Sequence, residues 1–491
     1  MTRPIERDLA KTREITQDGE NARFFEPTLL GFGLLVAWSM CMPQVRDKLV
    51  GFSGPATVSV TVHGLALIVL AVLCNRHRAC LFSRRRLAAG VALAYVSPLL
   101  SMVAGLAGPQ ALAATLRSMA ALCEGSSLAL LHLLWNEQYA RRTMATSWPC
   151  YAASFGIGPL MFCVLNAVPL PLAAAATFAL PLVGGFLLWH AACQTEQVEA
   201  IGECVEQSWQ FPWKPALIMT VFSFAHYMLM HLFGGAATPG QVGSLVVAGT
   251  VLIACVAFFD RFDPRVLYKL CPPLMVCALL SFSLGEHHLM EIGYALAYAG
   301  FTGFGLFMSF ILSSICFRYG VHAAWLFGIV EGCSVLAHMA GSFVGQSLLG
   351  WSAVAHASLA LPLDAVVVVL VLLSMLLLSE RDFVTTWGIH PAGRGSNRTG
   401  GVEAHSGAID ETAGAEGPDL ADRCARIARH FGLTHREEEV LALLTQGKTA
   451  SDIESVLFIS HNTVKGHIRH VYAKLGVHSR DDAVELVRKW R

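Results

Sequence analysis

Charged residues are scarce in this chain. Lysine, arginine, aspartate and glutamate make up only 14% of its 491 residues, whereas hydrophobic residues make up 54%. Soluble domains carry about 25% charged residues, and a soluble core does not need this much apolar material. The composition therefore argues against a wholly soluble protein and favours one that crosses a membrane several times.

Motifs of catalytic and metal-binding proteins are also missing. The 14 cysteines form no CxxC pair and are scattered through apolar segments, so we interpret them as small hydrophobic residues. The chain has no nucleotide-binding glycine loop, no HExxH zinc helix and no GxSxG elbow. The sequence therefore predicts no catalytic residue, no metal site and no cofactor, and we expect a protein that is not an enzyme.

The first 25 residues lack the apolar core of a secretory signal. They are mixed in charge and are not followed by a small-residue cleavage site. This pattern argues against a cleaved signal peptide. We therefore expect residues 1–25 to be a cytoplasmic segment that leads into a retained membrane helix.

Apolar runs of about 20 residues, the length that spans a bilayer as a helix, fill the next part of the chain. They form two groups of six, separated by a polar segment at 194–210. The expected helices lie near 26–45, 54–74, 87–107, 110–136, 145–167, 169–191, 214–235, 240–259, 267–285, 290–315, 321–349 and 354–378. We therefore predict a twelve-helix transmembrane domain over 26–379.

Basic residues are frequent in every second predicted loop and rare in the loops between. In membrane proteins, Lys and Arg near helix ends are retained on the cytoplasmic side. In the odd-numbered loops the only basic residues are Arg46 and Lys48. The even-numbered loops contain Arg76, Arg78, Arg84, Arg85, Arg86, Arg141, Arg142, Lys214, Arg261, Arg265, Lys269 and Arg318. This alternation predicts a multi-pass protein of the cell (inner, cytoplasmic) membrane with both termini in the cytoplasm.

Each group of six predicted helices has a basic loop after its second helix, "RHRACLFSRRR" and "DRFDPRVLYK", which suggests an internal repeat. This arrangement resembles the major facilitator superfamily. The second loop retains Asp260 and Arg261, whereas the first lacks the glycine and Asp-Arg pattern of that family. The resemblance implies a two-lobed bundle.

Ionisable residues inside membrane helices are costly and usually face a protein interior or water. Arg117 and Glu124 lie seven residues apart on one predicted helix, and Glu331 and His338 repeat this spacing on another. Each pair therefore shares a helix face. These four residues are candidates for sensing a small-molecule ligand; the alternative is that they form ion pairs that only hold the bundle together.

The helix that carries Glu331 also contains two glycine pairs at four-residue spacing. They are Gly328 with Gly332, and Gly341 with Gly345. Small residues at this spacing let the backbones of membrane helices approach closely. We expect the two pairs to serve helix packing.

Residues 380–421 lose all apolar periodicity and are rich in Gly, Ala, Ser and acidic residues. We interpret them as a flexible linker. As a random coil of roughly 40 residues it would span about 30 to 40 Å. The remaining residues, 422–491, carry twelve Lys or Arg against nine Asp or Glu, which indicates a separate, water-soluble domain.

Short amphipathic helices are predicted in this last segment. Thr434 and Glu437 have the spacing of a capping box that starts a helix, and Gly447 ends it. Thr449 and Asp452 start a second short helix in a similar way.

A third helix follows the cap residue Ser460, and a fourth ends the chain. On the third helix Val464, Ile468, Val471 and Leu475 form one apolar stripe. The opposite side is cationic, and the stretch 459–480 contains no acidic residue. Two short helices joined by a tight turn, the second with a basic exposed face, are typical of a helix-turn-helix that enters the major groove of DNA.

The run "LTHREEEVLALLTQGKTASDIESVLFISHNTVKGHIRHVYAKLGVHSRDDAVELV" resembles the LuxR-type DNA-binding domain. The resemblance implies sequence-specific binding to double-stranded DNA, as a homodimer paired through the C-terminal helix. By position, Lys465, Gly466 and Arg469 would approach base edges, whereas Thr463, His467 and Lys474 would contact phosphates. The second helix departs from the family pattern, which leaves phosphate contacts there open.

The expected fold is therefore all-α: a polytopic twelve-helix bundle in two groups of six, plus a small four-helix helix-turn-helix domain. We predict a membrane-embedded transcriptional regulator whose bundle senses a signal and controls DNA binding. Its expected partners are double-stranded DNA, the lipid bilayer, a small-molecule ligand and a second copy of the chain. The alternative is a secondary transporter of the major facilitator type with a regulatory DNA-binding appendage.

Overall fold

The computed structural model describes residues 25–355 apart from short gaps, a few residues between 365 and 372, and parts of 423–489. Every element described is a helix, as the all-α prediction requires. The chain divides into two compact units, a large N-terminal one and a small C-terminal one. The predicted N-terminal segment, except its last residue, and the predicted linker at 380–421 lie outside the described residues.

Eleven long helices follow a short 3-10 helix, η1 (Pro27–Leu30), in the first unit. They are α2 (Gly31–Val50), α3 (Ala56–His77), α4 (Arg84–Leu106), α5 (Gln110–Ala140), α6 (Met144–Ala167), α7 (Leu170–Thr195), α8 (Trp213–Leu232), α9 (Ala237–Ala257), α10 (Arg265–Ser283), α11 (His287–Tyr319) and α12 (Ala323–Ala355). All eleven are long and apolar enough to cross a membrane, and each coincides within a few residues with a predicted span. The predicted twelfth span, 354–378, lies mostly outside the described residues.

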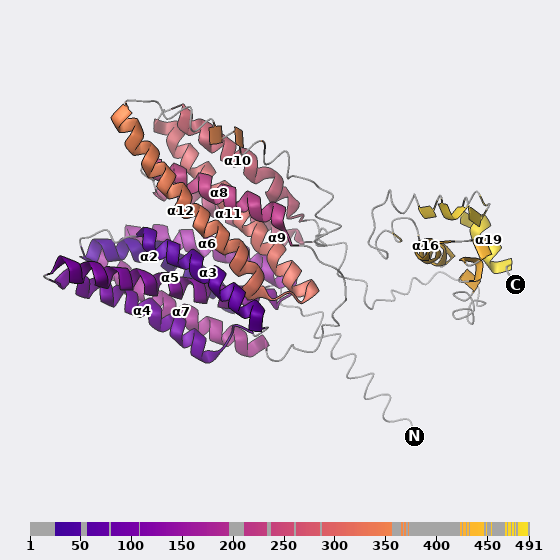
Figure 1. The fold of residues 1–491 in the computed structure, drawn as a ribbon, viewed down its shortest axis with the longest axis horizontal. Helices are drawn as coiled ribbons and strands as arrows, with labels where there is room; N and C mark the ends of the chain where they lie inside the picture. Colours follow the sequence, from indigo (N-terminus) through magenta and orange to yellow (C-terminus); the bar gives the residue numbers. More distant parts are fainter. Residues whose placement is uncertain are drawn as a thin grey trace, which may run out of the picture. The chain divides into compact units, whose positions relative to one another are not determined.

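The helices form two lobes, α2 to α7 and α8 to α12 (Figure 1). The lobes meet chiefly where α3 packs along α12 and α6 packs along α9. The most apolar stretch of α11 is 89% buried, the highest value among the eleven helices. The two-lobed bundle expected from the resemblance is therefore observed, with α11 enclosed by its neighbours.

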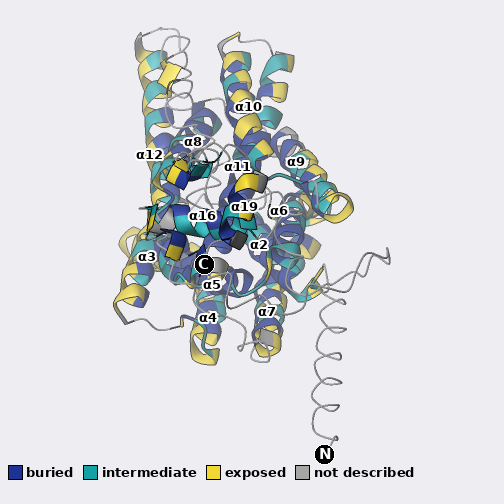
Figure 2. Ribbon diagram, turned by 90° about the vertical axis from the view of Figure 1, so that its right-hand side faces the viewer, coloured by how far each residue is buried: buried dark blue, intermediate teal, exposed yellow. Residues whose placement is uncertain are grey.

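The outer faces of the bundle are apolar. On α4, Leu99, Val103 and Leu106 are exposed, and Figure 2 shows exposed positions beside buried ones along the outer helices. Soluble proteins rarely leave apolar surface of this extent in water, whereas lipid accepts it. Together with the eleven candidate spans, this surface identifies the first unit as a multi-pass membrane domain.

The two glycine pairs of α12 pack against different helices, as expected. A Cβ atom added at Gly328 or Gly332 would strike α3, and one added at Gly341 or Gly345 would strike α8. At Gly345 it would lie 2.6 Å from the carbonyl oxygen of Met228. Helix α12 is therefore held close to α3 of one lobe and to α8 of its own.

Replacing Gly341 with valine should destabilise the bundle, because the added side chain would collide with the backbone carbonyl of Phe224 on α8. Overpacking of this kind costs about 1 to 3 kcal/mol, or more where backbone must move. The measurement is the thermal unfolding midpoint of the detergent-purified protein. Gly350→Val is the matched control on the same helix, since a Cβ there meets nothing within 4 Å; equal effects of both changes would contradict the packing role.

The second unit has its own hydrophobic core. Its described helices include α16 (His435–Thr445) and α19 (Arg480–Lys489). The buried core residues are Cys424, Ile427, Val440, Leu441, Leu444, Ile453, Val471, Leu475, Ala483 and Val487. Val471 and Leu475 belong to the apolar stripe predicted for the third helix, so this stripe faces the core as expected.

Candidate nucleic-acid interface and membrane-interior charges

The capping box predicted at the start of α16 is present. The backbone N–H of Thr434 donates to the Glu437 carboxylate at 2.8 Å, and the backbone N–H of Glu437 donates to Thr434 Oγ1 at 3.4 Å. These two bonds satisfy N–H groups that have no partner within the helix. They explain why α16 begins at His435.

Glu437 also binds a residue of the predicted recognition helix. Lys474 Nζ lies 2.6 Å from Glu437 Oε2, and His470 Nδ1 lies 3.8 Å from Oε1. The Glu437 side chain is 6% exposed, whereas that of Lys474 is 35% exposed. One buried carboxylate therefore joins the start of α16 to the predicted DNA-reading segment.

The surroundings of Glu437 favour its charged form. Burial alone would raise the pKa of this carboxyl, but the hydrogen bonds from Lys474 and Thr434 lower its pKa to about 2. A hydrogen bond to the ionised form always acts in this direction. The carboxylate therefore stays ionised, and paired with Lys474, throughout the physiological pH range.

The stability of the C-terminal domain should depend on this pair. The folded pKa of about 2 is below the ordinary 4.5, so the stabilisation is present above pH 4.5 and is lost as the pH falls towards 2. Allowing for solvent screening at Lys474, we expect a loss of about 1 to 2 kcal/mol between pH 7 and pH 3. The measurement is urea unfolding of a fragment containing residues 417–491 at pH 7 and at pH 3.

Glu437→Gln tests the same point, because glutamine can keep the capping box but cannot pair with Lys474. The variant should be less stable at pH 7 and should lose most of the pH dependence. Glu438→Gln, the neighbouring change on α16, is the control and should retain it. If Glu437→Gln unfolds like the unchanged fragment at both pH values, the ion pair contributes nothing to stability.

The predicted DNA-contacting residues are described only in part. Lys474 is on the helical segment that follows, with its ammonium group against Glu437, and His467 is half-buried on the same segment. Thr463, Lys465, Gly466 and Arg469 lie outside the described residues. Glu437 was predicted only as a helix cap; no local pattern signals its second partner, Lys474, which is 37 residues away.

Comparison with known proteins decides what this unit is. The model of the family "Bacterial regulatory proteins, luxR family" matches residues 432–487. Spore germination protein GerE of Bacillus subtilis is 54% identical over 57 residues, which cover 77% of GerE and 11% of this chain. The chain belongs to the luxR family of bacterial regulatory proteins. Its C-terminal unit is a helix-turn-helix DNA-binding domain.

Other luxR-family relatives match this domain alone. The transcriptional regulatory protein LiaR of Bacillus subtilis is 46% identical over 54 residues, or 11% of this chain and 26% of LiaR. The CsgBAC operon transcriptional regulatory protein of Escherichia coli is 46% identical over 52 residues, or 11% of this chain and 24% of that protein. The chain thus spans only about a quarter of these two relatives, whose names describe transcriptional regulators.

The helical bundle has remote structural neighbours among transporters. The human organic anion transporter MFSD10 superimposes with a TM-score of 0.49 at 13% identity, over 71% of this chain and 97% of that one. The nucleoside transporter NupG gives a TM-score of 0.40 at 14% identity, over 72% and 98% of the two chains. Similarity at this level does not bear on function.

Glu124, a sensing candidate, pairs with a residue that the sequence analysis placed in a loop. Arg46 Nη1 lies 2.6 Å from Glu124 Oε2, and the two side chains are 10% and 6% exposed. The loop assignment of Arg46 was wrong, because α2 continues to Val50. Arg117 instead donates its Nε–H to the carbonyl oxygen of Ala113, on its own helix, at 3.0 Å.

Glu331 and His338 have different surroundings although they share α12. His338 stacks on the ring of Tyr227 from α8. Glu331 has no cationic partner among the described residues, but it is close enough to Tyr151 of α6 to interact with it electrostatically. The four sensing candidates therefore do not form one cluster of paired charges.

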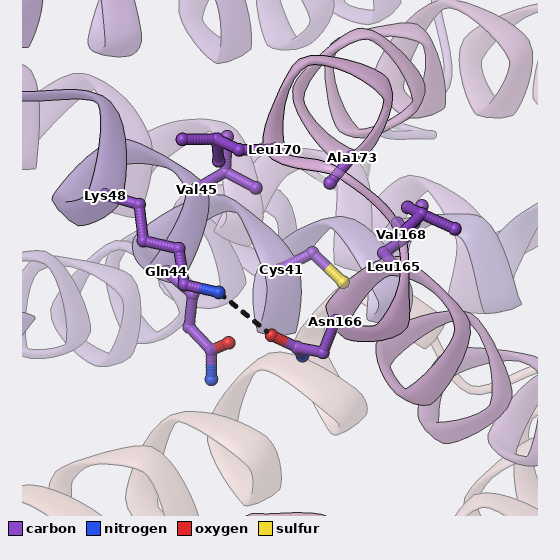
Figure 3. A pocket seen from close by; sticks show the side chains of 9 residues that line it. All are labelled: Cys41, Gln44, Val45, Lys48, Leu165, Asn166, Val168, Leu170 and Ala173. Carbon is purple, nitrogen blue, oxygen red and sulfur yellow. Dashed lines mark hydrogen bonds between the residues drawn. The ribbon is translucent and has the colours of Figure 1, made fainter.

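A small pocket lies elsewhere in the first lobe, between α2, α6 and α7 (Figure 3). Its volume is about 50 Å³, and Lys48 Nζ donates to Asn166 Oδ1 at 3.4 Å beside it. Ligand pockets usually measure about 300 to 1,000 Å³, so this pocket has room only for water. None of the four sensing candidates lines it.

Proposed function

We propose that this luxR-family protein is a membrane-embedded transcriptional regulator in which the helical bundle controls DNA binding by the C-terminal domain. The observation that carries the proposal is that one chain holds both the family match at 432–487 and eleven candidate membrane spans. A signal that binds one arrangement of the bundle better than another shifts the balance between them. That shift changes how freely the DNA-binding domain moves, or whether the DNA-binding domains of two copies pair.

The proposal requires the DNA-binding domain to be on the cytoplasmic side. Glu26, at the beginning of the bundle, pairs with Arg142 in the loop between α5 and α6 at 2.8 Å. Arg141 of the same loop lies 2.8 Å from Cys80 Sγ in the loop between α3 and α4. The beginning of the bundle and these two basic loops therefore share one face, and basic loops are retained in the cytoplasm. This arrangement supports a cytoplasmic N-terminus, and a twelfth span at 354–378, as predicted from the sequence, would return the chain to the same side before the DNA-binding domain.

DNA recognition is proposed to follow the luxR-family pattern. Lys465, Gly466 and Arg469 would approach base edges, while Thr463, His467 and Lys474 would contact phosphates. The Lys474 side chain pairs with Glu437 and is 35% exposed to solvent. Two copies are proposed to pair through the C-terminal helix on a two-part operator.

The test is genome-wide mapping of DNA bound by the full-length protein, combined with a reporter under one mapped promoter. We expect discrete sites, and we expect removal of residues 1–379 to change how the reporter responds while the isolated domain still binds the mapped DNA. An identical reporter response with and without the bundle would contradict control by the bundle. Substrate accumulation in vesicles that contain a protein truncated before residue 417 would support the transporter alternative instead.

A further inference from the structure

Glu331 is an ionisable side chain inside the membrane domain that has no counter-ion among the described residues. It lies on α12, which packs against α3 of the other lobe, so it is near the boundary between the lobes. The structure shows no cationic partner for it among the described residues, whereas Glu124 has Arg46 at 2.6 Å. The Glu331 residue is half-buried among the helices of the bundle.

A tyrosine, Tyr151 of α6, interacts electrostatically with Glu331. Tyr151 donates its hydroxyl hydrogen to Asn136 Oδ1 at 3.0 Å. Asn136 is 1% exposed, and its Nδ2 has no hydrogen-bond partner. Tyr151 also stacks on Tyr139 with ring centroids 3.7 Å apart. Tyr151, the residue that interacts with Glu331, is therefore itself held between the ring of Tyr139 and the amide of Asn136.

Further along α12, His338 lies among histidine and tyrosine side chains. His338 stacks on Tyr227, and it also interacts electrostatically with His226, His231 and His63. The ring nitrogens His63 Nε2 and His226 Nδ1 are buried and have no hydrogen-bond partner. Imidazole can donate or accept a hydrogen bond, so this region also has unused hydrogen-bonding capacity.

A carboxylate without a counter-ion in a region of low dielectric costs several kcal/mol, and a cation at the site offsets that cost. Aromatic faces attract cations further. We propose that Glu331 is the anionic anchor of a binding site for a small organic cation with an apolar or aromatic body, at the boundary between the lobes. The proposal rests on the regulatory function above, because the cation is then the signal that the bundle senses.

The other ligand classes fit less well. No three His, Cys, Asp or Glu side chains in the described part of the chain are grouped so as to hold a metal ion. An anion would need a free basic group, but the guanidinium of Arg46 is already neutralised by Glu124. An organic cation would pair with the Glu331 carboxyl group, and its apolar or aromatic body would contact the ring of Tyr151.

The test uses the full-length protein in lipid nanodiscs and benzyltrimethylammonium as the probe. This ion keeps its positive charge at every pH, and neopentylbenzene is its neutral isostere. Glu331→Gln should weaken binding of the cation at least tenfold and leave binding of the isostere unchanged. Glu291→Gln, which removes a carboxylate from an exposed position on α11, is the matched control and should bind the cation like the unchanged protein.

Each alternative result has a defined meaning. The proposal is wrong if the unchanged protein does not bind the cation, if it binds the isostere equally well, or if Glu331→Gln keeps the cation's affinity. If Glu331→Gln does not fold, as judged by thermal unfolding in detergent, Glu331→Asp replaces it and should retain a preference for the cation over the isostere. If the cation binds through Glu331 but leaves the reporter unchanged, the site stands and the regulatory function fails. If the reporter depends on the bundle but the cation does not bind, the regulatory function stands and the proposed cation site is wrong.

Discussion

Replacing Arg469 with alanine is expected to abolish selective binding to the operator. An arginine that contacts guanine through two parallel hydrogen bonds contributes about 1 to 3 kcal/mol of discrimination between bases. Its loss corresponds to a roughly 5- to 150-fold fall in the ratio of operator to random-DNA affinity. The measurement is fluorescence anisotropy of the C-terminal fragment with a mapped site and with a scrambled duplex, at one fixed salt concentration.

Two further substitutions define what this result means. Arg469→Lys keeps the positive charge but not the two-pronged geometry, so it should lose discrimination while keeping affinity for random DNA. Arg426→Ala removes an exposed arginine that precedes the family match at 432–487, and it should bind like the unchanged fragment. If Arg469→Ala discriminates between the two duplexes as well as the unchanged fragment, the assignment of Arg469 to base edges is wrong.

Replacing Arg46 with alanine is expected to destabilise the membrane domain strongly. Arg46 and Glu124 form a buried pair at 2.6 Å between α2 and α5, and removing one partner leaves the other charge buried and alone. Such a change costs about 3 to 5 kcal/mol. The measurement is unfolding of the purified protein in mixed micelles with increasing SDS, and Glu124→Ala should have a similar effect.

A double replacement separates a structural role from a sensing role. Arg46→Met combined with Glu124→Leu removes both charges, so it should recover most of the stability lost in either single variant. If the double variant still gives the normal reporter response, the pair is structural. If its stability recovers but its reporter response is altered while DNA affinity is unchanged, the pair takes part in sensing. Additive losses in the double variant would show that the two residues do not interact.

The sequence predicted the first eleven membrane helices because their signal is local. A run of apolar residues must bury its backbone polar groups in a helix wherever lipid surrounds it. The same reasoning missed the end of α2. Arg46 and Lys48 were assigned to a loop after a helix that was predicted to end near 45, but α2 is helical to Val50, and Arg46 pairs with a carboxylate inside the protein.

In the C-terminal domain, too, local features could be predicted from the sequence, whereas a contact between distant residues could not. The capping box of Thr434 and Glu437 involves residues three apart, so spacing alone indicated it, and the bonds are present. The pair between Glu437 and Lys474 joins residues 37 apart. Its formation depends on how α16 packs against the predicted recognition helix, and spacing does not reveal that.

The sequence by itself determined which segments are helices, which of them can lie in lipid, and that the chain ends in a luxR-family DNA-binding domain. These properties depend on neighbouring residues and on composition. Only the tertiary structure decided which charge meets which: Glu124 pairs with Arg46 and not with Arg117, and Glu331 has no cationic partner in the described part of the bundle. Partner choice among buried charges depends on distances of a few ångström between helices far apart in the chain, because electrostatic energy inside the protein falls steeply with separation.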